Sequence, residues 1–218
     1  VLFYDLAMTI EPETKSLHGG NMIRFRAMQD FDRLQVDLHA NLNIDKILYH
    51  GVGLTYTRDC NAVFVDFPRV VRQGSVDSMT ILYGGVPLEP EMLSLRGGIF
   101  WLTNRDNKMW IESVTQGIGA NVMWPCKDHL SDRADSMRIS VTIPSGLEEI
   151  SNGQLLGRTE LPGGHTRYVW YVHYPIPTYD IAINIGDYAH FSDVYAGKYD
   201  TFPLNFYCMR YNLDFARK

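Results

Sequence analysis

The hydrophobic and polar positions of this chain alternate in short runs, which is the two-residue period of a β-strand with one buried face. Residues 4–10 alternate in this way, a turn is expected at 11–20 (E-P-E-T-K-S-L-H-G-G), and the alternation resumes over residues 21–27. Two such runs joined by a turn predict a β-hairpin. Further strand-like runs lie at 33–38, 44–49, 54–57, 62–66, 78–83, 99–103, 109–112, 138–143, 153–160, 165–172 and 181–188.

Turn residues separate these runs, among them G-S at 74–75, G-G-V-P at 84–87, P-S-G at 144–146 and P-G-G at 162–164. Many short strands with turns between them are typical of antiparallel β-sandwiches. A helix is indicated at the end of the chain, where Asn212 is placed to cap a segment that begins L-D-F-A-R-K. We therefore predict an all-β fold, a saddle-like β-sandwich of mostly antiparallel strands, with the start of a linker helix at the C-terminus.

The run R-Y-V-W-Y-V-H-Y at 167–174 predicts which aromatic side chains face the core. Its even-numbered residues share one face, which we interpret as buried: Tyr168, Trp170, Val172 and Tyr174. Its odd-numbered residues, from Arg167 to His173, form the opposite and partly exposed face. Large aromatic side chains more often fill the space between two sheets than line a ligand site. An exposed aromatic row that stacks on sugar rings nevertheless remains an alternative.

Composition narrows the functional classes. The 218 residues suit one large domain, and 45% of them are hydrophobic, which is enough to bury a core. The formal charge of −5, with no cluster of Lys and Arg, argues against a nucleic-acid surface. No apolar run approaches the ~18 residues that a membrane span requires. The chain begins at Val1 without methionine, so we expect it to be processed or part of something longer, and its compartment stays open.

The stretch T-Q-G-I-G-A-N-V-M-W-P-C-K-D at 115–128 offers candidate chemistry of two kinds. Cys126 lies close to Lys127 and His129, so a Cys–His nucleophile is conceivable. The partners of a catalytic thiol usually come from elsewhere in the fold, however, and a cysteine in W-P-C is more often a packing residue. Gly117 and Gly119 lack the third glycine and the following helix of a dinucleotide-binding loop. We read them as positions where the backbone turns or passes close to another group.

Cysteine and histidine spacing gives no metal motif. Cys60, Cys126 and Cys208 are widely separated and form no C-x-x-C pair, although one disulfide bridge remains possible. The seven histidines include no H-x-x-x-H pair and no H-E-x-x-H sequence. We therefore expect neither a metal site nor a cofactor within this chain.

Residues 115–152 resemble a known family. T-Q-G-I-G-A-N-V-M-W-P-C-K-D-H-L-S-D-R-A, followed by M-R-I-S-V-T-I-P-S-G-L-E-E-I-S-N-G, is similar to the N-terminal β-domain of the aminopeptidase N-type zinc metallopeptidases, the gluzincin family that includes the leukotriene hydrolase/aminopeptidase. The opening Y-D-L-A-M-T-I-E-P-E-T-K-S-L-H-G resembles the first hairpin of that domain. I-A-I-N-I-G-D-Y and Y-N-L-D-F-A-R-K resemble its end and the helix that leads into the catalytic domain.

The catalytic motifs of that family are absent from this chain. The family's H-E-x-x-H supplies two zinc ligands on one helix face and a glutamate that activates water, and G-x-M-E-N precedes it. Neither occurs in these 218 residues. The resemblance therefore implies an N-terminal β-domain over residues 1–205 and a linker over 206–218 into a catalytic domain of the same polypeptide. It implies no catalytic residue and no cofactor here, and zinc in the full-length enzyme.

One position matches a substrate-binding residue of the family. By its distance from P-C-K-D, Gln116 corresponds to the glutamine or glutamate that binds the free α-amino group of the peptide substrate, because an amide oxygen accepts a hydrogen bond from an ammonium group. Gly117 would let the backbone turn so that Gln116 reaches the neighbouring domain. The alternative for Gln116 is a polar residue at a strand end. The alternative for the whole chain is a stand-alone β-sandwich that binds glycans or another protein.

Overall fold

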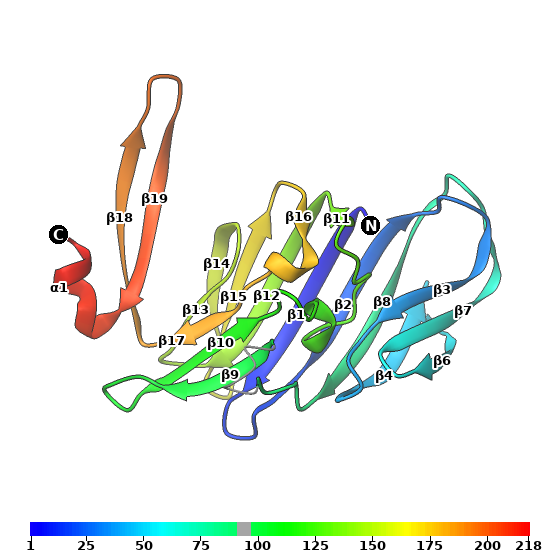
Figure 1. Ribbon diagram of the computed structural model, residues 1–218, viewed down its shortest axis with the longest axis horizontal. Helices are drawn as coiled ribbons and strands as arrows, with labels where there is room; N and C mark the ends of the chain where they lie inside the picture. The colour runs from blue at the N-terminus through cyan, green and yellow to red at the C-terminus, as the bar shows by residue number, and fades with distance from the viewer. Residues whose placement is uncertain (91–96) are drawn as a thin grey trace.

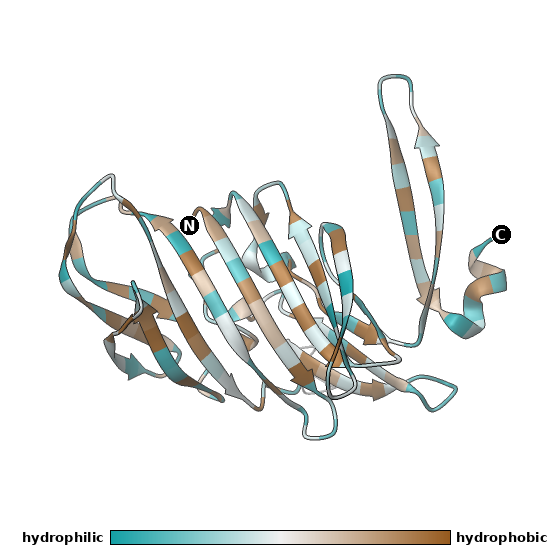
Figure 2. Ribbon diagram, turned by 180° about the vertical axis from the view of Figure 1, so that it is seen from behind, coloured by the Kyte–Doolittle hydropathy of each residue, from teal (hydrophilic) through white to brown (hydrophobic). Residues whose placement is uncertain are grey.

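The computed structural model describes residues 1–90 and 97–218, and it has the all-β architecture expected from the sequence (Figure 1). One large sheet forms the back of the molecule. Two smaller sheets and the segment around the 3₁₀ turn η1 (Ala120–Val122) cover one face of it (Figures 1 and 2). The strands pair mostly antiparallel, and the fold is a sandwich of sheets as predicted.

The large sheet has eight strands, in the order β14-β15-β12-β1-β2-β8-β4-β5. Strands β1 and β12 run parallel, with Phe3 opposite Ser136, and the neighbouring pairs on each side are antiparallel. The bounds of its strands are Phe3–Glu11 (β1), Ser16–Arg26 (β2), Leu42–Tyr49 (β4), Val52–Gly53 (β5), Val76–Gly85 (β8), Ser136–Pro144 (β12), Gln154–Leu161 (β14) and His165–Val172 (β15).

The other strands form small sheets. The four-stranded sheet contains β9 (Gly98–Thr103), β10 (Met109–Val114), β13 (Glu148–Ile150) and β17 (Asn184–Gly186). The three-stranded sheet contains β3 (Phe31–Asp37), β6 (Thr55–Asp59) and β7 (Ala62–Val71). Two pairs complete the set: β11 (Arg133–Ala134) with β16 (Ile176–Pro177), and β18 (Tyr188–Ala196) with β19 (Thr201–Met209). The helical turns are η1, η2 (Thr178–Asp180), η3 (Arg210–Asn212) and α1 (Leu213–Ala216).

The core lies between the large sheet and the elements that cover it. Strand β1 shows the expected alternation, since Tyr4, Leu6, Met8 and Ile10 are buried. Strand β15 repeats it with Tyr168, Trp170 and Val172. The interpretation of Tyr174 as a member of the same buried row is wrong: β15 ends at Val172, and Tyr174 is 80% exposed.

The first hairpin has a shorter turn than the sequence suggests. Strand β2 begins at Ser16, so the glycine pair at 19–20 lies within the strand, opposite Met8 and Ala7. A Cβ atom on Gly19 would come within 2.0 Å of the Ala7 carbonyl oxygen. These glycines therefore allow two strands to approach closely. In the sequence alone, such a glycine pair is indistinguishable from one that forms a turn.

The end of the chain differs most from the sequence pattern. The strand expected at 181–188 is limited to Asn184–Gly186, because η2 precedes it and Tyr188 already belongs to another sheet. The following hairpin β18–β19 was not predicted, and it projects from the body of the molecule (Figures 1 and 2). The short helix α1 follows Asn212 as expected, although the Asn212 side chain makes no capping hydrogen bond.

Candidate functional site

Gln116 lies in an exposed turn that follows β10. The backbone N–H of Ile118 donates to the carbonyl oxygen of Thr115 at 3.3 Å, which closes the turn, and Gly117 has φ of +85°. A positive φ at the third residue is the geometry of a type II turn, for which glycine is favoured. Both Gln116 and Gly117 are exposed to solvent. The predicted role of Gly117 in shaping the backbone thus has a structural basis, and the Gln116 side chain is accessible.

Hydrogen bonds on both sides fix the base of this turn. Thr115 is 3% exposed, and its hydroxyl donates to the carbonyl oxygen of Tyr179 at 2.6 Å. The backbone N–H of Gly119 donates to the Thr115 carbonyl oxygen at 2.8 Å. The first bond ties the turn to η2, which is distant in the sequence, and the second is local to the turn. Gln116 therefore lies in a turn whose base is hydrogen-bonded on both sides.

Gly119 adjoins a polar cluster that connects the turn to the rest of the fold. The Asn121 side-chain amide donates to the Asp128 carboxylate, and the Asp128 backbone N–H donates to the Asp37 carboxylate at 3.2 Å. Gly119 has φ of +96°, and a Cβ atom there would lie 1.8 Å from the Asp128 Oδ2 atom. The second glycine of G-I-G is thus required by a close approach, as expected from the sequence.

The W-P-C-K-D segment is a packing element. Trp124 is fully buried and contacts Tyr4 edge to face at 5.0 Å between ring centroids. The Asn21 side-chain amide donates to the Pro125 carbonyl oxygen at 2.8 Å, and Lys127 N–H donates to the Tyr4 hydroxyl at 3.1 Å. These bonds join the segment to strands β1 and β2 of the large sheet.

Cys126 is a structural residue in this setting. Its side chain is fully buried, and its backbone exchanges two hydrogen bonds with Asp37, of 2.8 and 3.1 Å. Burial, together with the carboxylates of Asp128 and Asp37, raises the pKa of the thiol well above its ordinary value. A catalytic cysteine needs the opposite, a lowered pKa and access to solvent. The nearby His129 instead bonds Ser131. The packing interpretation of Cys126 is confirmed.

A depression of about 260 Å³ lies beside the Gln116 turn. Its lining includes Gly117, Ile118, Gly119, Asp128, Leu130 and Tyr179. Leu130 is 75% exposed, so the depression has an apolar rim and one carboxylate. The turn, η2 and the segment after W-P-C-K-D therefore meet at one surface, although they are separated in the sequence.

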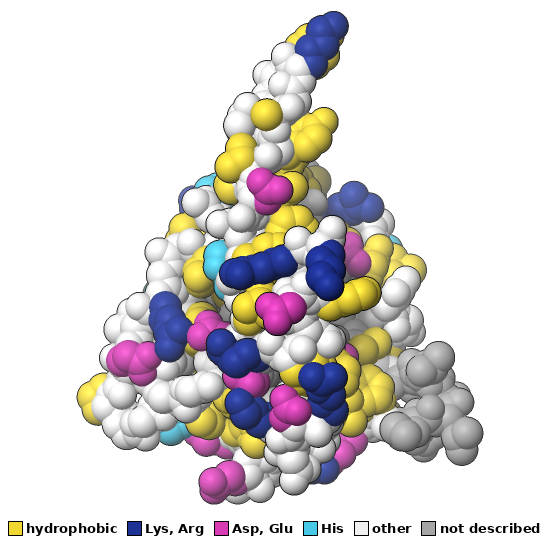
Figure 3. Space-filling model, turned by 90° about the vertical axis from the view of Figure 1, so that its left-hand side faces the viewer, with side chains coloured by type: hydrophobic (Ala, Val, Ile, Leu, Met, Phe, Trp, Pro, Cys, Tyr) yellow, Lys and Arg dark blue, Asp and Glu magenta, His cyan; other side chains and the backbone are white. Residues whose placement is uncertain are grey.

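The projecting hairpin is the second candidate surface, and the sequence interpretation missed it. Phe191 stacks on Phe206, and Tyr195 lies against Phe202, each at 5.0 Å between ring centroids. Figure 3 shows hydrophobic side chains along its length. Several large side chains of this hairpin and of α1 are exposed: Val194 (60%), Tyr195 (52%), Tyr199 (90%), Phe202 (46%), Phe206 (43%) and Phe215 (81%). Two runs rich in aromatic residues, joined by the turn-like segment G-K-Y-D at 197–200, were the signal that could have identified this hairpin.

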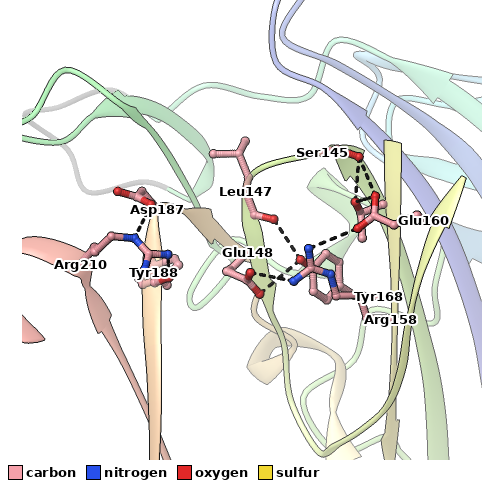
Figure 4. A network of polar contacts seen from close by, with 10 residues as sticks. Ser145, Leu147, Glu148, Arg158, Glu160, Tyr168, Asp187, Tyr188 and Arg210 are labelled. Atoms are coloured by element: carbon pink, nitrogen blue, oxygen red, sulfur yellow. Dashed lines mark hydrogen bonds and ion pairs between the residues drawn. The ribbon is translucent and has the colours of Figure 1, made fainter. Parts of the chain in front are cut away.

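Charged contacts fix the base of the hairpin. Asp187 accepts from Arg210 Nε at 3.0 Å and from Lys108 Nζ at 2.6 Å (Figure 4 shows the Arg210 contact). The Arg210 guanidinium also donates to the Tyr188 carbonyl oxygen at 3.0 Å. The Lys108 hydrogen bond is the largest of the effects that lower the pKa of Asp187, followed in the same direction by Arg210. The hairpin therefore leaves the body at a braced point.

A second polar network braces the neighbouring edge of the large sheet. Arg158 donates to Glu148 at 2.9 Å and to Glu160 at 3.2 Å, and the Tyr168 hydroxyl donates to the Leu147 carbonyl oxygen at 2.9 Å (Figure 4). These contacts connect β14 and β15 of the large sheet to β13 of the four-stranded sheet. The network closes one end of the sandwich near the hairpin.

Neither a metal centre nor a membrane helix is found in the part of the chain that the structure describes. Within residues 1–90 and 97–218, no three His, Cys, Asp or Glu side chains converge in a way that could hold an ion. Over the same ranges, no helix has the length and apolar character to cross a bilayer. The donor set of these described residues therefore does not fit a zinc ion.

The fold belongs to a recognisable class: it is found in M1 zinc metallopeptidases, the class to which the sequence resemblance points. Neither a family model nor a curated protein matches the sequence. Solved structures do match, with TM-scores near 0.80. At 23–24% identity, this likeness establishes the fold and no more. The predicted resemblance is confirmed at that level.

The particular matches include an M1 zinc metallopeptidase from Deinococcus radiodurans, with 24% identity and a TM-score of 0.79 over 94% of this chain and 46% of that one. A variant from the same organism bound to a Tyr-Ser-Ala substrate matches with 23% identity and a TM-score of 0.80, over 95% and 47% of the two chains. A two-domain M1 zinc metallopeptidase variant bound to L-arginine matches at 24% identity and 0.80. The chain thus spans about half the length of the structures it matches.

Proposed function

We propose that this chain is the N-terminal, non-catalytic domain of a zinc aminopeptidase that removes N-terminal residues from peptides. One observation favours this above all: 94% of the chain superimposes on roughly half of a two-domain M1 zinc metallopeptidase. In this proposal, residues 1–205 form the domain and residues 206–218 lead into a catalytic domain of the same polypeptide. The bound zinc would polarise the carbonyl of the first peptide bond, held by ligands outside this chain.

Within the proposal, this chain covers the active-site cleft and holds the amino end of the substrate. Gln116 offers an amide oxygen to the peptide ammonium group from a turn fixed by Thr115 and Tyr179. Its exposure in this chain suits a residue that meets a second domain. Hydrogen bonds to a charged group contribute roughly 1.5–3 kcal/mol. Anchoring the ammonium group would place the first peptide bond of the substrate at the site of cleavage.

The hairpin β18–β19 and α1 supply the second part of the proposal. Exposed aromatic residues such as Phe206 and Phe215 cost free energy in water, and patches of this kind mark interaction surfaces. The end of the chain lies next to the hairpin base (Figure 1). We place the catalytic domain against this surface. The alternative is a stand-alone module that binds glycans or proteins. In that case the exposed aromatic residues would contact a separate ligand and not a second domain of the same polypeptide.

Kinetics of the full-length polypeptide test the role of Gln116. Gln116→Ala should lower kcat/KM for aminoacyl anilides roughly ten- to a hundredfold, because the ammonium group loses its acceptor. Gln116→Glu keeps an acceptor and should retain most of the activity. Gln73→Ala, at another exposed glutamine, is the matched control. Unchanged kinetics in Gln116→Ala would exclude the residue from substrate binding.

The 218-residue chain alone, supplied with zinc, should not hydrolyse these anilides. Hydrolysis by the chain alone would contradict a non-catalytic role. Saturable glycan binding by the chain, together with no peptidase activity in the full-length protein, would support the alternative function.

A further inference from the structure

A pocket of about 580 Å³ lies at the end of the sandwich where the chain passes from β2 to β3, and no function proposed above uses it. Its volume falls within the ~300–1,000 Å³ typical of small-molecule sites. Ile23, Phe25 and Val36 line it, and these side chains are at most 6% exposed. The pocket therefore reaches the hydrophobic core itself.

The walls of the pocket are apolar and adaptable. Phe31 and Leu34 of β3 add partly buried side chains, and Phe31 lies 5.9 Å from Phe25 between ring centroids. Met28, which also lines the pocket, is 78% exposed, and a methionine side chain adjusts readily to the shape of a ligand. Burying a hydrocarbon chain here would remove apolar surface of both ligand and protein from water.

The charged residues of the exposed lining are basic. Arg26, Arg33 and Lys127 are exposed lining residues, and Asp132 is the acidic one among the described lining. Asp132 is already engaged, since its carboxylate pairs with Lys127 Nζ at 3.2 Å and with the Val1 amino group at 3.3 Å. Arg33 lies 3.6 Å from the Asp66 carboxylate. Arg26 has no ion-pair partner among residues 1–90 and 97–218.

We propose that this pocket binds a small aliphatic carboxylate, with its hydrocarbon chain against Ile23, Phe25 and Val36 and its carboxylate at Arg26. The apolar interior selects the chain, and the uncompensated guanidinium selects the negative charge. A cationic ligand is disfavoured because Asp132, the acidic residue of the described lining, already pairs with Lys127. An uncharged ligand would leave Arg26 without a partner.

Calorimetric titration of the full-length natural polypeptide, including any residues that precede Val1, tests this site. The probes are sodium octanoate and sodium hexanoate below their micelle concentrations, and 1-octanol. Octanoate should bind saturably and roughly fifteenfold more tightly than hexanoate, because two methylene groups contribute about 1.6 kcal/mol. Octanol should bind several-fold more weakly than octanoate. Absence of saturable binding, or equal affinity for octanoate and hexanoate, would overturn the proposal.

Matched arginine variants test the charge. Arg26→Gln should weaken octanoate binding several-fold and leave octanol binding unchanged. Arg24→Gln removes the neighbouring exposed arginine of β2, which does not line the pocket, and should alter neither. Leu34→Trp, which places a larger side chain in the pocket, should weaken both probes. Equal effects of Arg24→Gln and Arg26→Gln would show general charge attraction and overturn the assigned site; these two substitutions are at exposed positions, so the test stands if Leu34→Trp fails to fold.

Discussion

The body of the sandwich and the hairpin β18–β19 are both built mostly from antiparallel strands, yet they differ in how far their side chains are buried. In β1, Tyr4, Leu6, Met8 and Ile10 are at most 3% exposed, whereas the other face of the strand is more open to solvent. In β19, none of the nine residues is buried. The body thus has one inner and one outer face, and the hairpin is accessible on both.

This difference indicates where the stability of each region comes from. An isolated two-stranded hairpin is marginally stable in water, because it lacks a second layer against which to bury side chains. The hairpin here keeps its shape through cross-strand aromatic pairs, such as Phe191 with Phe206, and through the Asp187–Arg210 contact at its base. The body needs no other molecule to bury its core. The exposed aromatic surface of the hairpin is therefore best explained by the proposed second domain.

Removal of a large side chain should separate the two regions most clearly. Trp124→Ala leaves a cavity in the body, where Trp124 is fully buried, and should lower the free energy of unfolding by about 3–5 kcal/mol. Phe206→Ala, at a residue 43% exposed, should cost about 1 kcal/mol or less in the 218-residue chain. Urea denaturation followed by fluorescence measures both. Similar losses for the two variants would contradict the contrast between body and hairpin.

Glu149 lies where the body meets the hairpin, and it makes stability depend on pH. It is 1% exposed, its Oε2 accepts from Trp170 Nε1 at 2.7 Å, and burial raises its pKa to about 8. The unfolded chain releases this proton near pH 4.5, whereas the folded chain holds it until about pH 8. The stabilisation that Glu149 contributes is therefore fully present below about pH 4.5, and it is lost as the pH rises through about 8.

Glu149→Gln should remove that dependence, because the amide keeps an acceptor for Trp170 and has no proton to lose. Compared with the variant, the unsubstituted chain should lose a few kcal/mol of stability between pH 4.5 and 8. Urea denaturation at several pH values gives the difference, with Glu148→Gln as the control at the adjacent, more exposed carboxylate. A constant difference between Glu149→Gln and the unsubstituted chain would show that Glu149 is not protonated in the folded state.

Gly117 and Gly119 offer a matched pair in the candidate site. Both have positive φ, so alanine at either position is strained by roughly 1 kcal/mol or more. At Gly117 a Cβ atom would meet nothing within 4 Å, whereas at Gly119 it would collide with Asp128. We expect Gly119→Ala to cost roughly 2–3 kcal/mol and Gly117→Ala about 1 kcal/mol, measured by thermal unfolding. Equal costs would mean that Asp128 moves away freely and does not brace the turn.

The sequence predicts the body of this fold better than the hairpin. Strands such as β15 have one buried face, and the alternation of Tyr168, Trp170 and Val172 indicates both the strand and its orientation. In β18–β19 the polar and aromatic residues are exposed on both faces, so alternation has no single inner side to mark. The turn predicted at residues 11–20 was too long for another reason. Glycines that permit close strand contact, such as Gly19 and Gly20, look the same in the sequence as glycines in a turn.

The candidate site was predictable in part. The position of Gln116 followed from its distance to P-C-K-D, and the structure places it in an exposed turn; its contact with a substrate stays a prediction. The contacts of Thr115 with Tyr179 and of Asp128 with Asp37 depend on chain segments that only the folded topology brings together. The division at residues 205 and 206 also stays a prediction, as does zinc in the full-length enzyme.

The labelling rates of the three cysteines compare the solvent accessibility of the two regions directly, and this is the smallest of the expected effects. Cys60 is exposed, Cys126 is buried, and Cys208 in β19 is partly exposed. In the 218-residue chain, a maleimide reagent should therefore label Cys60 first, then Cys208, and Cys126 only on unfolding. In the full-length polypeptide, a domain docked on the hairpin should slow Cys208 several-fold without changing Cys60, which lies in the turn between β6 and β7. An unchanged Cys208 rate, measured by mass spectrometry of labelled peptides, would mean that the hairpin base stays open, and the catalytic domain would then have to dock elsewhere.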